Sequence, residues 1–398
     1  MKGVILAGGQ GEELHPYTID KPKALVKIVG KELILHTIDR LVEHNVKDIT
    51  VVTGHMGKQI RSFLGNGRDL GVSISYIEQQ ESGIDGAIKS LVPQFSNEEA
   101  FVLLHTDIVA DLGILTRTLN AMNNLGTDMA LAVTLQEEIQ DFGVVGLDSD
   151  GKVKRVYPSG DASHGNYVVA GTFVLSGRIL KYIDEGIPFN QCFNRFIEEG
   201  GDVAAGIWNE NWVDVGRPWD IIRASKLFLS KIENMQINKD AEIDPNARIT
   251  GNVIIEKGAR ILSGAVINGP AYIGRDTLIG NNSLIRDSSV IEKGAIVGMG
   301  CEIKTSVLLP SCTIARLSYI GDSIVGERST VHAGCVTINN LPGEKKIVAK
   351  IGESVFEVPL EKFGAIIGPD AYVNPNCTLY PGSFVDKGQI LEPNTLLK

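Results

Sequence analysis

The sequence lacks several features that mark particular classes of protein. Its 398 residues include five scattered cysteines without a Cys-x-x-Cys pair, so we expect buried, reduced thiols and no zinc site. No apolar run approaches the ~20 residues that a membrane span needs, and Met1 leads directly into a strand-like run without a signal peptide. The net charge of -10 argues against nucleic acid or an anionic membrane as the main partner. We therefore expect a cytoplasmic protein of two or three domains.

The first 230 residues alternate apolar, strand-like runs with amphipathic helical stretches. This alternation predicts an α/β domain with a Rossmann-like, largely parallel mixed sheet that helices cover on both faces. Ligands of such sheets bind at the carboxyl ends of the strands, where the sequence places a glycine loop (Gly8, Gly9, Gly11) and Asp107. Such a loop either exposes backbone N–H groups to an anion or makes a tight turn. The strand-like runs are 3–7, 48–53, 72–77, 100–104 and 129–134, and one helical stretch is 33–44.

Residues 231–398 follow a six-residue period. An aliphatic residue recurs at every sixth position from Ile243 to Leu309, and the period returns from Ile367 to Leu397. Turns rich in Gly, Asn and Asp between these positions indicate a parallel β-helix, in which we expect six coils. The phase slips after Leu309, and residues 338–366 break the period. That segment predicts a protruding loop, which either carries function or is a tolerated insertion.

The glycine loop belongs to a longer motif that resembles a known family signature. Residues 4–18 read VILAGGQGEELHPYT, and residues 21–24 read KPKA. This motif resembles the sugar-1-phosphate nucleotidylyltransferases, which join an NTP to a sugar 1-phosphate. The order of the two domains resembles the archaeal bifunctional N-acetylglucosamine-1-phosphate uridylyltransferases/glucosamine-1-phosphate acetyltransferases. The resemblance implies a left-handed β-helix, a homotrimer, Mg²⁺ and acetyl-CoA.

The resemblance also implies roles for residues of the first domain. Asp107 in FVLLHTD and Asp214 in WVDVGRPW match the metal-binding aspartates, and Lys23 matches a phosphate-binding lysine; we take these three as catalytic. Carboxylate oxygens suit Mg²⁺. For the sugar, the matches are Gly143 and Gly171; we add Arg155, rather than Lys154, as a candidate cation that the family pattern does not supply. For the nucleotide, they are Leu6, Ala7, Gly8, Gly9, Gly11, Lys23, Gln79 and Gly83.

Four positions depart from the family pattern. Glu13 replaces an arginine beside the leaving pyrophosphate, Ile84 replaces a threonine near the base, and Tyr157 replaces the lysine that holds the sugar phosphate. Loss of one preorganised cation costs about 10²- to 10³-fold in rate. Strand alternation places Arg155 on the same face as Tyr157, so Arg155 is the candidate replacement cation. In the second domain Arg316 replaces the catalytic histidine, and arginine is no base near neutral pH.

Two hypotheses fit these departures. The first is a divergent, weak or inactive nucleotidylyltransferase that uses Mg²⁺, followed by an acetyltransferase-like domain in which Tyr319, Asn339 and Lys345 still match family positions. The second is a non-catalytic subunit that binds a nucleotide or sugar nucleotide and regulates a catalytically complete paralogue.

Overall fold

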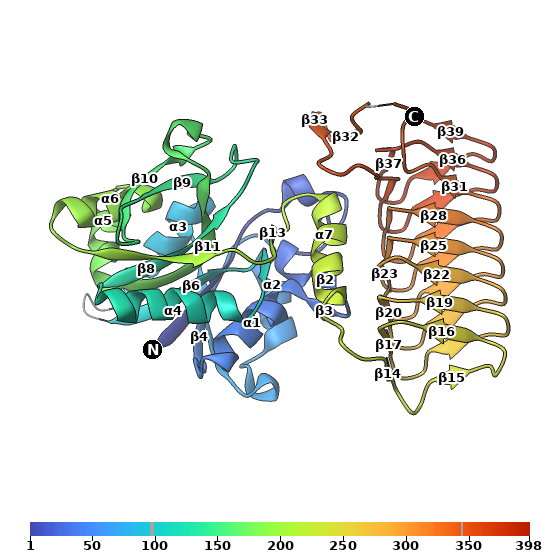
Figure 1. Cartoon of the computed structure of the whole chain (residues 1–398), viewed down its shortest axis with the longest axis horizontal. Coiled ribbons are helices and arrows are strands. Elements are labelled where there is room, and N and C mark those ends of the chain that lie inside the picture. The colour runs from blue at the N-terminus through green and yellow to red at the C-terminus, as the bar shows by residue number, and fades with distance from the viewer. Residues whose placement is uncertain (96–98, 344) are drawn as a thin grey trace. The chain divides into compact units, whose positions relative to one another are not determined.

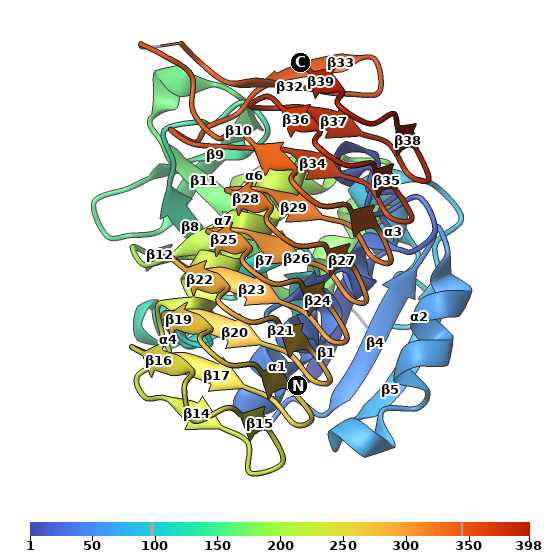
Figure 2. The same ribbon diagram turned by 90° about the vertical axis from the view of Figure 1, so that its right-hand side faces the viewer.

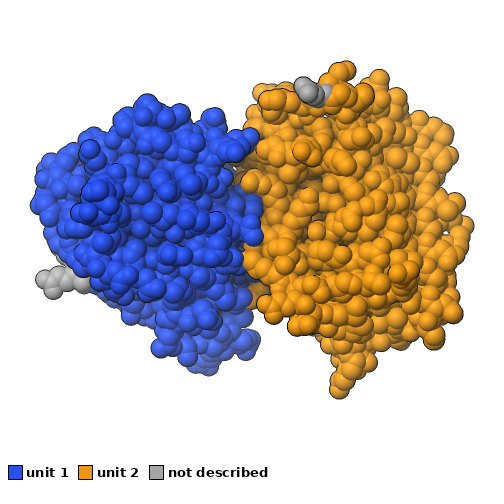
Figure 3. Space-filling model, in the orientation of Figure 1, with its two compact units in different colours: residues 1–10, 21–26, 32–214 blue, residues 11–20, 27–31, 215–398 orange. Residues whose placement is uncertain are grey.

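A computed structural model describes residues 1–95, 99–343 and 345–398, and its internal contacts divide into two compact units (Figure 3). Unit 1 comprises residues 1–10, 21–26 and 32–214; unit 2 comprises residues 11–20, 27–31 and 215–398. The sequence pattern changes at about residue 230, whereas the units divide after Asp214. Helix α7 (Pro218–Leu229) belongs to unit 2 because it packs on β-helix strands and its Trp219 ring meets Phe363 edge to face. None of the described helices is long and apolar enough to cross a membrane.

A nine-stranded mixed sheet forms the centre of unit 1 (Figure 1). Strands β5, β4, β1 and β6 lie side by side and parallel, as the sequence predicts. Beyond β6 the sheet changes direction, because β11 runs antiparallel to β6, β8 and β9. The strands are β1 Lys2–Ala7, β4 Asp48–Thr53, β5 Ser73–Glu78, β6 Ala100–His105, β8 Met129–Leu135, β9 Gly143–Leu147, β10 Val153–Ser159, β11 Tyr167–Ser176 and β12 Val203–Trp208. A separate two-stranded sheet joins β7 (Ile108–Ala110) and β13 (Trp212–Asp214).

Helices cover both faces of this sheet. Along β1 and β6, alternate residues enter two different hydrophobic clusters: Val4 and Leu103 join one, and Ile5 and Leu104 join the other. Because successive strand side chains point to opposite faces, these two clusters are the two faces of the sheet. The first face packs on α3 (Gly83–Lys89), α5 (Leu180–Asp184) and α6 (Phe189–Glu198); the second packs on α1 (Leu33–Glu43), α2 (Gly57–Leu64) and α4 (Gly113–Leu125).

Unit 2 is built around a left-handed parallel β-helix whose short strands stack in three sheets (Figure 2). The first sheet holds β14 Gln236–Ile237, β17 Val253–Ile255, β20 Ala271–Ile273, β23 Ser289–Ile291, β26 Val307–Leu308, β29 Ile324–Val325, β34 Ile366–Ile367 and β37 Phe384–Val385. The second holds β15 Glu242–Ile243, β18 Arg260–Ile261, β21 Leu278–Ile279, β24 Ile296–Val297, β27 Thr313–Ile314, β30 Thr330–Val331, β35 Tyr372–Val373 and β38 Ile390–Leu391. The third holds β16 Arg248–Thr250, β19 Val266–Asn268, β22 Leu284–Arg286, β25 Glu302–Lys304, β28 Tyr319–Gly321, β31 Val336–Thr337, β36 Thr378–Leu379 and β39 Leu396–Leu397. The hairpin of β2 (Lys27–Ile28) and β3 (Lys31–Glu32) lies outside these three sheets.

Each sheet contains eight strands, so the β-helix has eight coils rather than the six expected from the sequence. The two further coils are made by the repeats after the phase slip, β27 to β31, which stay in register with their neighbours, and by β14 before the first predicted repeat. Ile285 pairs with Ile303 eighteen residues later, whereas Ile303 pairs with Ile320 only seventeen later. The missing residue falls before β26, so Leu308 rather than Leu309 enters the core.

Residues 338–365 leave the stack between β31 and β34, and we call them the excursion. The stack of coils is continuous across the excursion, because β29 pairs directly with β34. The described part of the excursion contains an antiparallel hairpin of β32 (Val348–Ile351) and β33 (Ser354–Glu357).

Candidate active site in unit 1

A cavity of about 180 Å³ opens at the carboxyl ends of β1, β5 and β6. Its lining brings together residues that lie far apart in the sequence, and six of them belong to the predicted nucleotide or metal site. Those six are Leu6, Gly8, Gly9, Gln79, Gly83 and Asp107. Ile84, Ala87 and His105 complete the lining, so the departure from the family pattern at residue 84 also faces the cavity. Ala7 lies between two lining residues, whereas Gly11 belongs to unit 2.

The glycine loop and Gln79 approach each other closely in this cavity. A Cβ atom at Gly8 would collide with the carboxamide of Gln79, so a larger residue at this position would displace that side chain. By contrast, nothing lies within 4 Å of a Cβ built on Gly9. The backbone at Gly9 is therefore accessible to an anion, while Gln79 presents its amide at the rim of the loop.

Lys23 bridges the two predicted metal-binding aspartates. Its Nζ lies 2.5 Å from Asp107 Oδ2 and 3.9 Å from Asp214 Oδ1. The aspartates come together because β7 and β13 pair with Asp214 opposite Ile108, the neighbour of Asp107. Burial would raise the pKa of Asp107, but the charges of Lys23 and His105 hold it below its usual value. Asp107 is therefore ionised at neutral pH, with the Lys23 ammonium beside it.

This pair of carboxylates fits a divalent cation such as Mg²⁺. One cationic group already reaches both side chains, which remain about 30% exposed (Asp107 29%, Asp214 30%). Among the described residues no group of three His, Cys, Asp or Glu side chains could hold a metal alone. Mg²⁺ commonly keeps several waters and takes one or two carboxylates plus substrate phosphates, which matches a two-aspartate site.

Helix α1 supports the turn that carries Asp107. Arg40 is 1% exposed and donates from Nη2 to the carbonyl of Ile108 at 2.9 Å, while Thr37 Oγ1 lies 3.4 Å from the carbonyl of Thr106. Burial lowers the pKa of Arg40 to about 10, and the charge of Asp107 opposes that shift. Sequence reasoning missed Arg40. The available signal was an arginine on the buried side of an otherwise apolar helix face.

The predicted sugar-binding residues lie in β9, β10 and β11. Gly171 has a φ of 65° and packs against His105 and Ile108, so it adjoins the cavity lining. Gly143 begins β9. Arg155 Nη1 lies 3.9 Å from Glu198 Oε1 at the end of α6, and its side chain is 54% exposed. Its proposed role as a replacement cation at the sugar phosphate stays a prediction.

Tyr157 takes part in a local aromatic contact. Its ring stacks on His164 at 3.6 Å between centroids and packs beside the apolar cluster of Ile139, Val144 and Val168. The structure thus gives Tyr157 a packing role where the family pattern has a lysine.

Glu13 lies in unit 2 and has a cationic neighbour there. Its side chain is 62% exposed, with Oε2 4.0 Å from Arg217 Nε. The guanidinium of Arg217 in turn stacks over the ring of Phe356, 4.7 Å from its centroid. Glu13 therefore turns to solvent and to Arg217.

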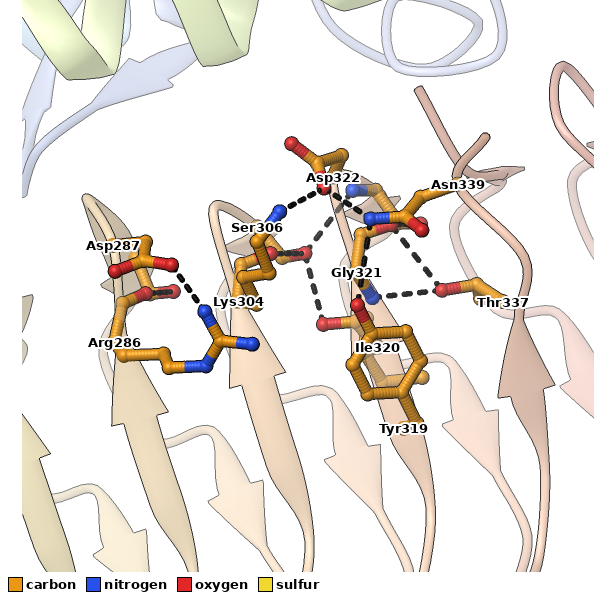
Figure 4. Close-up of polar contacts among 12 residues, drawn as sticks. Arg286, Asp287, Lys304, Ser306, Tyr319, Ile320, Gly321, Asp322, Thr337 and Asn339 are labelled. Atoms are coloured by element: carbon orange, nitrogen blue, oxygen red, sulfur yellow. Dashed lines mark hydrogen bonds and ion pairs between the residues drawn. The ribbon is translucent and has the colours of Figure 1, made fainter. Parts of the chain in front are cut away.

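In the β-helix, two of the predicted acetyltransferase-like residues join one polar network (Figure 4). Asn339 Nδ2 donates to Asp322 Oδ2 at 2.5 Å and lies 3.4 Å from the hydroxyl of Tyr319. Lys304 Nζ donates to the same Asp322 oxygen at 2.9 Å. Arg316 and Lys345 are exposed.

Two family models and several curated proteins match this chain. The nucleotidyl transferase family model matches residues 2–231, and the model of the GMPPB C-terminal domain matches residues 267–356. The "Bifunctional protein GlmU" of Methanococcus maripaludis strain C7 is 33% identical, with 100% of this chain and 94% of that protein covered. The "Bifunctional sugar-1-phosphate nucleotidylyltransferase/acetyltransferase" of Sulfurisphaera tokodaii is 28% identical, with 96% and 93% covered.

A solved structure also resembles part of the chain. It is a putative glucose-1-phosphate thymidylyltransferase from Bacillus anthracis, with 25% identity and a TM-score of 0.51, and the match covers 56% of this chain and 93% of that one. Together, the family model over residues 2–231 and the full-length archaeal relatives show that this chain belongs to the nucleotidyl transferase family.

Proposed function

We propose that unit 1 is a sugar-1-phosphate nucleotidylyltransferase site that binds a nucleoside triphosphate with Mg²⁺ and turns over slowly. The observation that carries this proposal is the bridge from Lys23 to Asp107 and Asp214 beside the glycine loop. A magnesium–triphosphate complex requires carboxylates that can bind the metal ion and, close to them, backbone N–H groups that can bind the phosphates.

In the proposed reaction an oxygen of the sugar 1-phosphate attacks the α-phosphorus of the NTP. The bond from that phosphorus to the β-phosphate oxygen breaks, and pyrophosphate leaves. Lys23 is a compact cation on a flexible stem, so it can exchange a carboxylate for a phosphate oxygen. Mg²⁺, when bound, would neutralise charge on the phosphates. Glu13 and Tyr157 supply no cation, and this is why we propose turnover at least about 10²-fold slower than in relatives.

Substitution of the family residues at positions 13 and 157 tests this proposal. We expect Glu13→Arg to tighten NTP binding in calorimetry, because it removes a negative charge and adds a positive one. Pyrophosphate release should rise only modestly in Glu13→Arg, and further in Glu13→Arg/Tyr157→Lys than in either single variant.

The neighbouring exposed Glu12 offers a matched control, since Glu12→Arg makes the same change in net charge. If Glu12→Arg tightens NTP binding equally, the effect is one of general charge and not of position 13. Fast turnover by the native chain that Glu13→Arg slows would overturn the proposal.

A regulatory subunit is the second candidate. It is favoured by the combined departures at Glu13, Tyr157 and Arg316 and by the use of Asn339 and Tyr319 in an internal network. In this case the chain binds a magnesium–nucleotide complex without releasing pyrophosphate, and it changes the rate of a catalytically complete paralogue when the two are mixed. Acetyl transfer from acetyl-CoA to glucosamine 1-phosphate would be absent in both cases, because Arg316 is no base.

We also propose a cytoplasmic homotrimer. The outer side of the second β-helix sheet exposes Ile296 (39%), Tyr372 (44%) and Ile390 (65%), and Leu317 after β27 is 64% exposed. Large exposed apolar residues gathered on one face favour association. Light scattering that gives three times the mass of the 42.9 kDa chain would support this, and a stable monomer at micromolar concentration would reject it.

A further inference from the structure

Unit 2 contains a second, larger cavity of about 690 Å³. Three parts of the unit line it: the segment of residues 11–20, the β32–β33 hairpin and the last coils of the β-helix. It shares no lining residue with the cavity of unit 1. Its volume falls in the range of pockets that hold small organic ligands.

The cavity walls combine positive charge with flat apolar groups. Lys350 and Lys398 line it, and among the described residues neither forms an ion pair. Lys398 Nζ instead lies 5.6 Å from the ring centroid of Tyr380, and the ring of Phe384 is also in the lining. Asp386 is a carboxylate in the described lining, and it accepts the N–H of Lys387. The ammonium groups of Lys350 and Lys398 can donate to an anion, and the rings favour a planar group.

The hairpin wall is held in place by close packing. A Cβ atom at Gly382 would collide with the carbonyl of Val348, and Gly382 has a φ of 82°, so glycine is required where the hairpin meets the coil. Ala349 and Ile351 are buried, whereas the intervening Lys350 is exposed. The strand alternation thus fixes the hairpin by one face and leaves Lys350 on the other.

We propose that this cavity binds a nucleoside diphosphate group, either free or as part of a nucleotide sugar. The base stacks against Tyr380 or Phe384, and the two phosphates accept from Lys350 and Lys398. Base–aromatic stacking and ammonium–phosphate pairing are both common means of nucleotide recognition.

An occupant of this cavity would touch the segment that carries Glu13. His15 and Ile19 of the lining belong to residues 11–20. This segment is anchored in unit 2, because the Tyr17 hydroxyl donates to the carbonyl of Ile324 at 3.1 Å and Asp20 pairs with Lys387. Occupation would therefore stabilise one position of the phosphate-signature segment. This regulatory consequence rests on the proposed function, whereas the binding itself does not.

Calorimetry without added Mg²⁺ and with EDTA tests the binding. The probes are ADP, GDP, CDP, UDP and UDP-glucose, and inorganic pyrophosphate and coenzyme A serve as comparison ligands. We expect at least one nucleotide to bind, and Lys350→Gln/Lys398→Gln to weaken that binding about tenfold or more. The matched control is Lys239→Gln/Lys362→Gln, which removes two exposed lysines outside the lining and should leave the affinity unchanged.

A second set of variants separates this site from unit 1. Gln79→Ala should leave the EDTA-resistant binding intact, and hydrogen exchange of residues 11–20 should slow when the nucleotide is added. Absence of EDTA-resistant binding, or its loss in Gln79→Ala but not in the lysine variant, would overturn the proposal. Equal binding of pyrophosphate, or preferential binding of coenzyme A, would also overturn it. If no variant releases pyrophosphate, the proposed function of unit 1 fails while this result stands.

Discussion

Each unit contains an ion pair between a lysine and an aspartate. The Nζ–Oδ2 distance is 2.5 Å in the Lys23–Asp107 pair of unit 1 and 2.9 Å in the Lys304–Asp322 pair of unit 2. Their surroundings differ. Asp107 is 29% exposed, lines a cavity and shares Lys23 with a second carboxylate, Asp214. The side chain of Asp322 is only 7% exposed and also accepts a hydrogen bond from Asn339. The first pair can exchange its cation for a ligand, whereas the second is already satisfied inside the protein.

Asp322 also fixes both ends of the excursion. Its side chain accepts from Asn339, where the excursion starts, and its backbone carbonyl accepts the N–H of Gly364, where it returns, at 2.8 Å. The carbonyl of Asn339 accepts the N–H of Phe363 at 2.9 Å. Residues that match an acyltransferase pattern therefore hold a loop in place here. A family-matching residue implies an open site only where its polar atoms are left for a ligand.

The largest effect that we expect concerns the buried pair. Asp322→Leu leaves the ammonium of Lys304 buried without its partner, and loss of one member of such a pair costs about 3–5 kcal/mol. Lys304→Met/Asp322→Leu removes both charges and should recover much of that loss. Chemical unfolding of unit 2, followed by circular dichroism, measures both changes. If the loss in the double variant equals the sum of the losses in Asp322→Leu and Lys304→Met, the pair is not coupled.

Disruption of the Lys23–Asp107 pair should have the opposite effects, with a small loss of stability and a large loss of binding or turnover. Asp107→Asn keeps the shape of the side chain and leaves Lys23 near Asp214, so we expect less than about 1 kcal/mol of lost stability. It removes a ligand of the proposed metal, and we expect Mg²⁺-dependent nucleotide affinity or turnover to fall about 10²-fold. Calorimetry with Mg²⁺–NTP and the unfolding midpoint are the two readouts. A large stability loss with unchanged binding would make Asp107 structural, like Asp322.

The sequence predicted the strands around unit 1's cavity well because each is an apolar run bounded by polar residues. The run 48–53 is β4 itself, and β1 and β6 each differ from their predicted runs by one terminal residue. It also predicted that the glycine loop and Asp107 would meet, since carboxyl ends of neighbouring parallel strands share one edge. The partnership of Asp107 with Asp214 was implied only by the family resemblance, and the pairing of β7 with β13 that brings them together was not predicted.

Other features were missed or had no readable signal in the sequence. Arg40 supports Asp107 from a helix, and its position on the buried, otherwise apolar face of that helix was a signal that sequence reasoning missed. The one-residue shortening before β26 depends on which of two adjacent leucines enters the core, Leu308 or Leu309, and both are apolar. The Asp322 network depends on stacking of successive coils, because Lys304 and Asp322 are eighteen residues apart and meet only in the folded β-helix.

The smallest effect that we expect concerns an exposed pair that joins two coils across the excursion. Arg328 donates from Nε and Nη2 to the two carboxylate oxygens of Asp370, at 2.7 and 2.8 Å. These hydrogen bonds hold the pKa of Asp370 below its usual value, so the pair stabilises the fold above about pH 4 and loses that effect as pH falls through the folded-state pKa. Both side chains are more than a third exposed, and solvent screening limits the contribution to about 0.2–1 kcal/mol. We expect Arg328→Met to lower the thermal midpoint slightly at pH 7, less so in 1 M salt, and not at all near pH 2. A loss that persists at pH 2 would mean that Arg328 stabilises the coil junction through the packing of its aliphatic stem rather than through its charge.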